Sequence, residues 1–241
     1  MSMFCYQCQE AAKNVGCTTR GVCGKEEVTA NHMDVLVYNL KGLAYLARKK
    51  AEAGESIGEE GHFIMQALFA TITNANFDTD RITELTFEAV ERKKALAATY
   101  AVGEKLPAEA TFDAKSLPEL EAAFAAASVL ATEDEDVRSL REFIVYGLKG
   151  IAAYGDHAAV LGYQDEEIYR EVIDELVATI EERSLEELTE VLVATGNTAV
   201  KTMTLLDQAN TATYGHPELT RVNIGTRNRP GLLISGHDLK D

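Results

Sequence analysis

The sequence predicts a mainly α-helical fold, with two three-helix bundles side by side, an N-terminal cysteine-bearing loop before them and the first strand of a truncated α/β domain after them. Three observations predict this arrangement. All four cysteines lie within the first 23 of 241 residues. Apolar residues then recur at three- and four-residue spacing up to about residue 212, which is typical of amphipathic helices. A short apolar run at 231–235 follows near the C-terminus.

The first segment, residues 1–25, shows no hydrophobic periodicity and is rich in glycine, threonine and cysteine. This composition predicts an ordered loop wrapped around a bound group. The spacing of its cysteines is C-x2-C-x8-C-x5-C, formed by Cys5, Cys8, Cys17 and Cys23. Glycines between and beside them would let the backbone approach an inorganic core closely.

Three kinds of site compete for these cysteines. Disulfides rarely persist in the cytoplasm, where this chain is expected to reside. Zinc sites usually carry two C-x2-C pairs, whereas the second pair here is C-x5-C. An iron–sulfur cluster accepts irregular spacing, because its irons lie at separate corners that ligands approach from different sides. The spacing favours an iron–sulfur cluster, with zinc as the alternative.

Residues 26–212 are predicted to form the helical domain, whose first unit spans about 26–103. One helical face carries apolar residues at i, i+4, i+7 and i+10, namely Leu36, Leu40, Leu43 and Leu46. The same pattern returns over Phe63, Ile64, Ala67, Leu68 and Thr71. Asp80 is a plausible N-cap for a third helix that runs to about Tyr100.

The second unit, about 119–212, is predicted to repeat the first at an offset of 108 residues, after a connector at about 103–117 that is marked by Pro107 and Pro118. The sequence YNLKGLA at 38–44 resembles YGLKGIA at 146–152. A chance match is the simpler explanation, but the aligned apolar positions favour a true repeat. Gly42 and Gly150 lie at equivalent places inside helices, where each costs about 1 kcal/mol relative to alanine. We therefore expect a close helix crossing or a ligand beside both glycines.

Residues 213–241 are predicted to begin an incomplete α/β domain. The apolar run 231–235 is flanked by Pro230 and Gly236 and is typical of a buried strand in a parallel sheet. A buried strand needs neighbours for its backbone donors and acceptors, and no other good strand candidate is present. The sequence is therefore expected to be the front part of a longer protein.

The amino-acid composition excludes some classes of binding partner. The formal net charge of −16 argues against nucleic acid and anionic membranes, because both are polyanions. No window is long and apolar enough for a membrane span, and the N-terminus lacks the basic and apolar regions of a signal peptide. We therefore expect a cytoplasmic protein that binds neither nucleic acid nor membranes.

Several motifs together resemble the N-terminal part of the hybrid-cluster proteins, also called prismane proteins or hydroxylamine reductases. They are MFCYQCQE at 3–10, GCT at 16–18, GVCGK at 21–25, GHP at 215–217 and GLLISGHDLKD at 231–241. The resemblance spans essentially the whole chain. It implies that Cys5, Cys8, Cys17 and Cys23 bind a [4Fe–4S] cluster and that the helical part is two three-helix bundles.

The resemblance also implies a function. Family members are more than twice this length and carry a second, hybrid [4Fe-2O-2S] cluster, one of whose ligands maps onto His237. The implied activity is reduction of hydroxylamine to ammonia, or of nitric oxide to nitrous oxide, with electrons from an external reductase or ferredoxin-like donor. Most hybrid-cluster ligands have no counterpart here, so the hybrid cluster is expected only in a full-length protein.

Two alternatives stay beside this hypothesis. One is a non-enzymatic electron-transfer or redox-sensing fragment that carries only the [4Fe–4S] cluster, and the other is a structural zinc-bound helical protein. Among the surrounding residues, Arg20 and Lys25 are candidates for tuning the cluster, since positive charge favours its reduced state.

Overall fold

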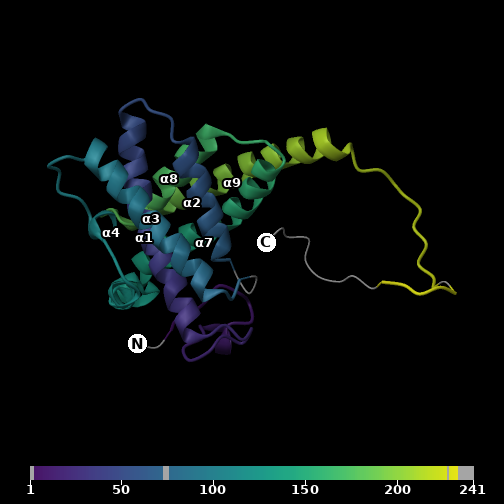
Figure 1. Ribbon diagram of the computed structural model, residues 1–241, viewed down its shortest axis with the longest axis horizontal. Helices are drawn as coiled ribbons and strands as arrows, with labels where there is room; N and C mark the ends of the chain where they lie inside the picture. Colours follow the sequence, from purple (N-terminus) through teal and green to yellow (C-terminus); the bar gives the residue numbers. More distant parts are fainter. Residues whose placement is uncertain (1–2, 73–75, 227, 233–241) are drawn as a thin grey trace.

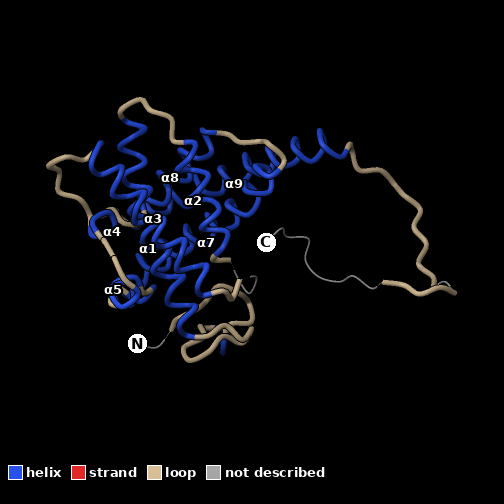
Figure 2. The backbone as a smooth tube through the Cα atoms, viewed as in Figure 1, coloured by secondary structure: helices blue, strands red, loops and turns tan. Residues whose placement is uncertain are grey.

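The computed structural model describes residues 3–72, 76–226 and 228–232, and these are mainly α-helical (Figure 2). No strand occurs among them; the β-type pairing is an isolated antiparallel bridge between Cys5 and Cys17. The predicted helical class is confirmed for this part of the chain. No helix in the described ranges is both long and apolar enough to span a membrane.

Three helices lie in the first of the two predicted units, which we call the first repeat: α1 (Glu27–Glu52), α2 (Gly58–Ala70) and α3 (Thr79–Tyr100). The predicted apolar face of α1 is confirmed, because all four of its leucines are fully buried. The face predicted for α2 is also buried. The N-cap of α3 is Asp78, whose side chain accepts a hydrogen bond from the Arg81 backbone N–H, so the prediction of Asp80 is wrong by two residues. Asp80 instead lies in the first turn of the helix.

The second repeat contains α7 (Glu135–Val160), α8 (Glu166–Ala178) and α9 (Leu185–Tyr214). Both ends of α7 and of α8 lie 108 residues after the corresponding ends of α1 and α2. Each of these helices has a side-chain N-cap, and Ser184 forms a reciprocal capping box with Glu187 at the start of α9.

The segment between the repeats carries four short helices: α4 (Ala108–Thr111), α5 (Leu117–Glu121), α6 (Phe124–Ala127) and the 3-10 helix η2 (Val129–Ala131). Part of the predicted connector, 103–117, is therefore helical. Residues 119–131, predicted to begin the second unit, form short helices, and the first long helix of that unit begins at Glu135. Lys93 on α3 holds this segment, because its buried ammonium donates to the backbone oxygens of Glu109 at 2.7 Å and Phe112 at 2.9 Å.

The two repeats share one hydrophobic core. The largest buried cluster takes side chains from both repeats, including Leu40, Leu68, Ile144 and Leu176. The packing crosses between the repeats: α2 packs mainly against α7, and α8 packs mainly against α1 (Figure 1). At the α2–α8 crossing, a Cβ on Gly61 would lie 2.4 Å from the Tyr169 ring, so only glycine permits this approach.

Gly42 and Gly150 differ although they are equivalent in the repeat. A Cβ on Gly42 would lie 2.1 Å from the Glu109 carbonyl oxygen, so the predicted close approach is confirmed there, with α4 as the neighbour. A Cβ on Gly150 would meet nothing within 4 Å among the described residues, so no close helix crossing occurs there, and the ligand alternative stays a prediction. The physical reason is that α4 covers α1, whereas this face of α7 is exposed.

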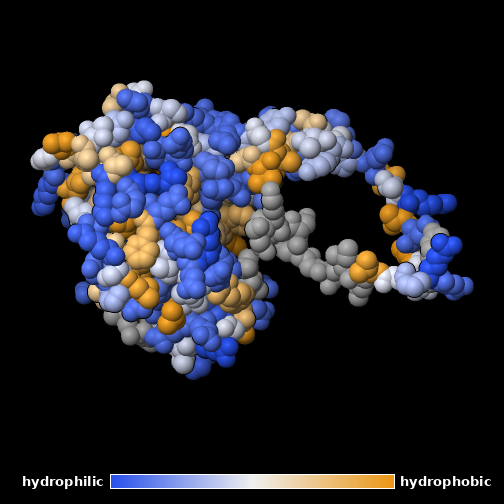
Figure 3. All heavy atoms as spheres, viewed as in Figure 1, coloured by the Kyte–Doolittle hydropathy of each residue, from blue (hydrophilic) through white to orange (hydrophobic). Residues whose placement is uncertain are grey.

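Residues 215–226 and 228–232 carry no helix or strand and extend away from the helical body (Figure 1). The predicted strand begins in this segment at Gly231, and most of it, with His237, lies outside the described residues. The face of the helical body seen in Figure 3 is mostly hydrophilic, with apolar residues in scattered patches, in keeping with the strongly acidic composition.

Candidate metal centre

The cysteine loop lies beneath the N-terminal end of α1 (Figure 1). A bridge pairs Cys5 with Cys17 within this loop: the Cys5 N–H donates to the Cys17 carbonyl at 3.0 Å, and the Cys17 N–H donates to the Cys5 carbonyl at 2.8 Å. This bridge brings together cysteines that are separated by 11 residues in the sequence. The loop is therefore closed by backbone pairing and not by a disulfide.

The segment between the first and third cysteines is shaped by a short 3-10 helix, η1 (Ala12–Asn14). The Ala11 N–H donates to the Cys8 carbonyl at 3.1 Å, which turns the chain directly after the C-x2-C pair. The Ala12 N–H donates to the Cys17 sulfur at 3.4 Å. A backbone donor at a cysteine sulfur stabilises a thiolate, as is typical of iron–sulfur ligands.

Two glycines, Gly21 and Gly24, form the turn that positions the fourth cysteine, Cys23. The Gly24 N–H donates to the Gly21 carbonyl at 2.9 Å, so a tight turn encloses Cys23. Gly24 has a φ of 97°, which L side chains rarely adopt. A Cβ on Gly21 would lie 3.0 Å from the Cys23 sulfur, so a side chain here would crowd this thiol.

All four cysteines are free thiols, and their exposure is graded. Cys17 is buried, Cys5 and Cys8 are partly buried, and Cys23 is exposed. Among the described residues, no three His, Cys, Asp or Glu side chains gather where a single metal ion could bind. The ligands of a four-iron cluster surround a larger core than those of one ion. The free thiols, the sulfur-directed N–H group and the glycine at Cys23 fit such a cluster.

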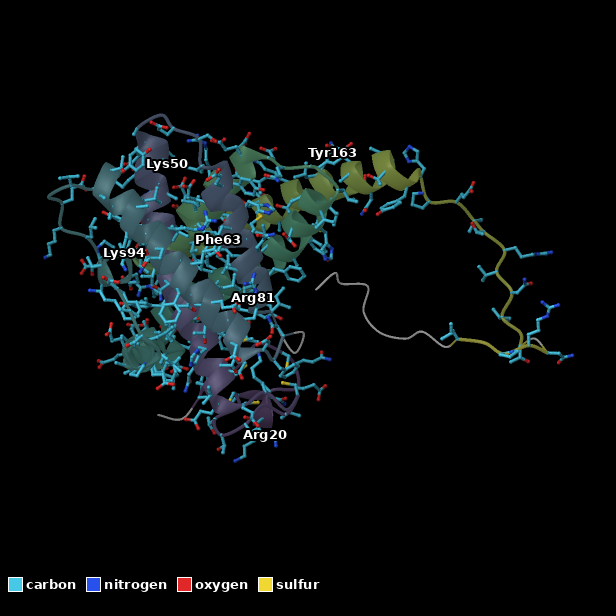
Figure 4. All side chains as sticks on the ribbon, viewed as in Figure 1. Arg20, Lys50, Phe63, Arg81, Lys94 and Tyr163 are labelled. Atoms are coloured by element: carbon cyan, nitrogen blue, oxygen red, sulfur yellow. The ribbon has the colours of Figure 1, made fainter. Side chains whose placement is uncertain are left out.

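Positive charge accompanies the thiols. Lys25, which directly follows the last loop glycine, is 2% exposed, and its ammonium lies 3.1 Å from the Met33 sulfur. Arg20 lies on the outer edge of the loop and points outward (Figure 4); it is within 4.0 Å of the exposed Glu26. Of the two residues predicted to tune the site, Lys25 is therefore the better placed, because buried charge is screened less than exposed charge.

Behind the loop, α1 and α7 contribute four charged residues, which we call the charged quartet: Asp34 and Lys41 on α1, and Glu142 and Lys149 on α7. They line one polar pocket of about 110 Å³ together with Gln7 from the loop. The four residues occupy equivalent positions in the two repeats, because the 108-residue offset aligns Asp34 with Glu142 and Lys41 with Lys149. The two repeats thus present the same charge pattern to the back of the cysteine loop.

The α7 half of the quartet binds the loop directly. The Tyr6 hydroxyl donates to Glu142 Oε2 at 2.7 Å. Lys149 Nζ donates to Gln7 Oε1 at 3.2 Å. Tyr6 and Gln7 are the two residues between Cys5 and Cys8, so both side chains inside the C-x2-C pair are held by the second repeat.

Burial governs the protonation of these groups. Desolvation raises the pKa of the Cys5 thiol, while the positive charges of Lys25 and Lys149 act in the opposite direction. Burial also raises the pKa of Asp34 and lowers the pKa of Lys149, and the attraction between these two groups partly offsets both effects. For Tyr6, burial and the Glu142 carboxylate together raise the pKa, so the phenol stays a hydrogen-bond donor.

Sequence reasoning did not identify the quartet. Gln7 and Lys149 are 142 residues apart, and only the tertiary packing shows their contact. Two signals were available. The repeat aligns the acidic and the basic pair, and Lys149 lies at i+4 from Val145 and i−3 from Ala152 on the buried face of α7, where a solvated lysine is not expected.

The Prismane/CO dehydrogenase family model matches residues 3–241 of the chain. Curated relatives named hydroxylamine reductase are similar over the whole chain. The chain is 52% identical to the protein from Halothermothrix orenii over 252 aligned residues, covering 100% of this chain and 45% of that protein. It is 47% identical to the proteins from Nitratidesulfovibrio vulgaris and Methanocaldococcus jannaschii, covering 99% of this chain and 45% and 44% of those proteins. The chain thus spans less than half the length of these relatives.

Proposed function

Because the chain belongs to the Prismane/CO dehydrogenase family, we propose that it is the electron-relay part of a hybrid-cluster oxidoreductase, with a [4Fe–4S] cluster on Cys5, Cys8, Cys17 and Cys23. One observation carries this proposal: four free thiols lie on one loop that is paired by backbone hydrogen bonds between Cys5 and Cys17 and that lies beside the buried Lys149, with buried Lys25 at its end. When bound, the cluster would accept and pass on one electron at a time.

The residues of the chain supply the environment for that step. The Ala12 N–H would stabilise negative charge on the Cys17 sulfur, and the ammonium groups of Lys25 and Lys149 would stabilise it on Cys5. Exposed Cys23 places one corner of the loop at the surface, where an external donor, such as a reductase or a ferredoxin-like protein, would deliver electrons. Free thiols are also typical of proteins that work in the cytoplasm.

The activity we propose for the complete protein is reduction of hydroxylamine to ammonia, or of nitric oxide to nitrous oxide. The support is the similarity to relatives that are named hydroxylamine reductases. In this proposal residues 1–25 receive electrons, and His237 provides one ligand of a second, hybrid cluster. Neither nucleic acid nor a membrane is proposed as a partner.

The first test is the metal content of the chain purified without oxygen. We expect about four irons and a matching amount of acid-labile sulfide per chain, broad absorbance near 400 nm, and an electron paramagnetic resonance signal on reduction. Replacing any one of the four cysteines by serine should remove the cluster or leave it incomplete. Thr18→Ala, next to Cys17 on the same loop, is the matched control and should keep full iron. Zinc in place of iron would overturn the proposal.

The second test separates an enzyme from an electron-transfer or redox-sensing module. A longer protein that begins with this chain should reduce hydroxylamine, and it should lose that activity when Cys8 is replaced by serine. A longer protein that binds both clusters but turns over neither hydroxylamine nor nitric oxide would refute the proposed activity and favour the module.

A further inference from the structure

We propose that Glu142 and Lys149 of α7, and not only the residues of the cysteine loop, set the reduction potential of the cluster that the loop holds. This inference rests on the proposed function, because it requires a cluster on the four cysteines. It adds two positioning residues that lie far from the cysteines in the sequence and belong to the other repeat.

The first support is direct contact. Tyr6 and Gln7 occupy the two positions inside the Cys5–Cys8 pair, and each bonds to one of the α7 residues, at 2.7 Å for Glu142 and 3.2 Å for Lys149. Residues 142 and 149 are two helical turns apart and therefore lie on the same face of α7. Together they fix the backbone that presents the first two cysteines.

The second support is charge in a place where solvent screens it little. Lys149 is 5% exposed, and it lines the same small cavity as Cys5 and Lys25. Reduction adds one negative charge to the cluster. A cation nearby stabilises the reduced form and raises the potential, whereas an anion nearby lowers it. Lys149 and Glu142 must therefore act with opposite signs.

Opposite signs give the inference a specific test. Lys149→Gln should lower the midpoint potential of the cluster, and Glu142→Gln should raise it while keeping an acceptor for the Tyr6 hydroxyl. Each shift should change the ratio of reduced to oxidised cluster at a fixed potential by about tenfold, which corresponds to about 59 mV for a one-electron couple. Lys149→Arg keeps the charge and should stay close to the unmodified protein.

The matched controls are Lys201→Gln and Glu167→Gln, which change the net charge by the same amounts. Lys201 on α9 and Glu167 on α8 form an exposed ion pair at 2.8 Å, and neither bonds to a described residue of the cysteine loop. The measurement is a redox titration followed by electron paramagnetic resonance on anaerobic chain with its iron counted. Neither control should shift the potential beyond the error of the titration.

Each outcome of the redox titration either supports or refutes an effect of Glu142 and Lys149 on the potential. Full iron in both α7 variants with unchanged potentials, or with shifts of the same sign, would overturn the inference and leave the proposed function intact. If Lys149→Gln does not take up the cluster, Glu142→Gln decides alone: a raised potential supports the inference and an unchanged one refutes it. Absence of iron from the unmodified chain would overturn the proposed function and this inference with it.

Discussion

Alanine at the two equivalent glycines, Gly42 and Gly150, should change the stability of the protein in opposite directions. Both glycines lie in the interior of long helices, where glycine costs about 1 kcal/mol relative to alanine. That gain is the same for both substitutions. The difference comes from what the new methyl group meets.

At Gly42 the methyl group of an alanine would collide with the backbone of α4. Its Cβ would lie 2.1 Å from the Glu109 carbonyl oxygen and 2.7 Å from the Ala110 nitrogen, so α4 must move away. Overpacking of this kind costs about 1–3 kcal/mol. Moving α4 also disturbs the bond of 2.7 Å from the Lys93 ammonium to the Glu109 oxygen, which adds about 1 kcal/mol or more. We expect a net loss of about 1–3 kcal/mol for Gly42→Ala.

At Gly150 the methyl group would contact no described residue within 4 Å, so the gain in helix propensity remains. We expect Gly150→Ala to raise the free energy of unfolding by about 0.5–1 kcal/mol. The assay is anaerobic urea denaturation followed by circular dichroism at 222 nm, with the slope of the transition checked for each variant. A stabilising Gly42→Ala, or equal effects at the two sites, would refute the reasoning.

Two further predictions concern individual side chains. Glu175 is 5% exposed, and burial raises its pKa from 4.5 to about 7. Between these two pH values the folded state therefore binds more protons than the unfolded state. The free energy of unfolding should fall as pH rises through this window. Glu175→Gln should therefore flatten the pH dependence and stabilise the protein at pH 8 by up to about 3 kcal/mol, and an unchanged urea midpoint at pH 8 would contradict it. Asp78→Ala should cost about 1 kcal/mol through loss of the α3 N-cap, whereas Asp80→Ala should cost less; the reverse order in thermal unfolding would argue for Asp80 as the cap.

The sequence predicted the local features of the fold because helices depend on neighbouring residues. The leucine face of α1 follows from a 3.6-residue period, and it is buried as expected. The two sequence motifs align at an offset of 108 residues, and the ends of α7 and α8 lie at the same offset from the ends of α1 and α2. The error at the start of α3 has a local cause as well, since Asp78 and Asp80 are both suitable caps and only the backbone geometry distinguishes them.

The sequence by itself determined the helical class of the described residues, and it predicted the repeat and the iron–sulfur cluster on the four cysteines, because each depends on spacing along the chain. Only the tertiary structure decided which helices of the two repeats pack together and that α4 covers Gly42, whereas no described residue covers Gly150. It also decided that Glu142 and Lys149 bond to the side chains of the two residues between Cys5 and Cys8. The physical reason is that such contacts join residues more than 60 positions apart, and their geometry depends on how six long helices fill one shared core. Periodicity shows which face of a helix is buried, but not which partner covers it.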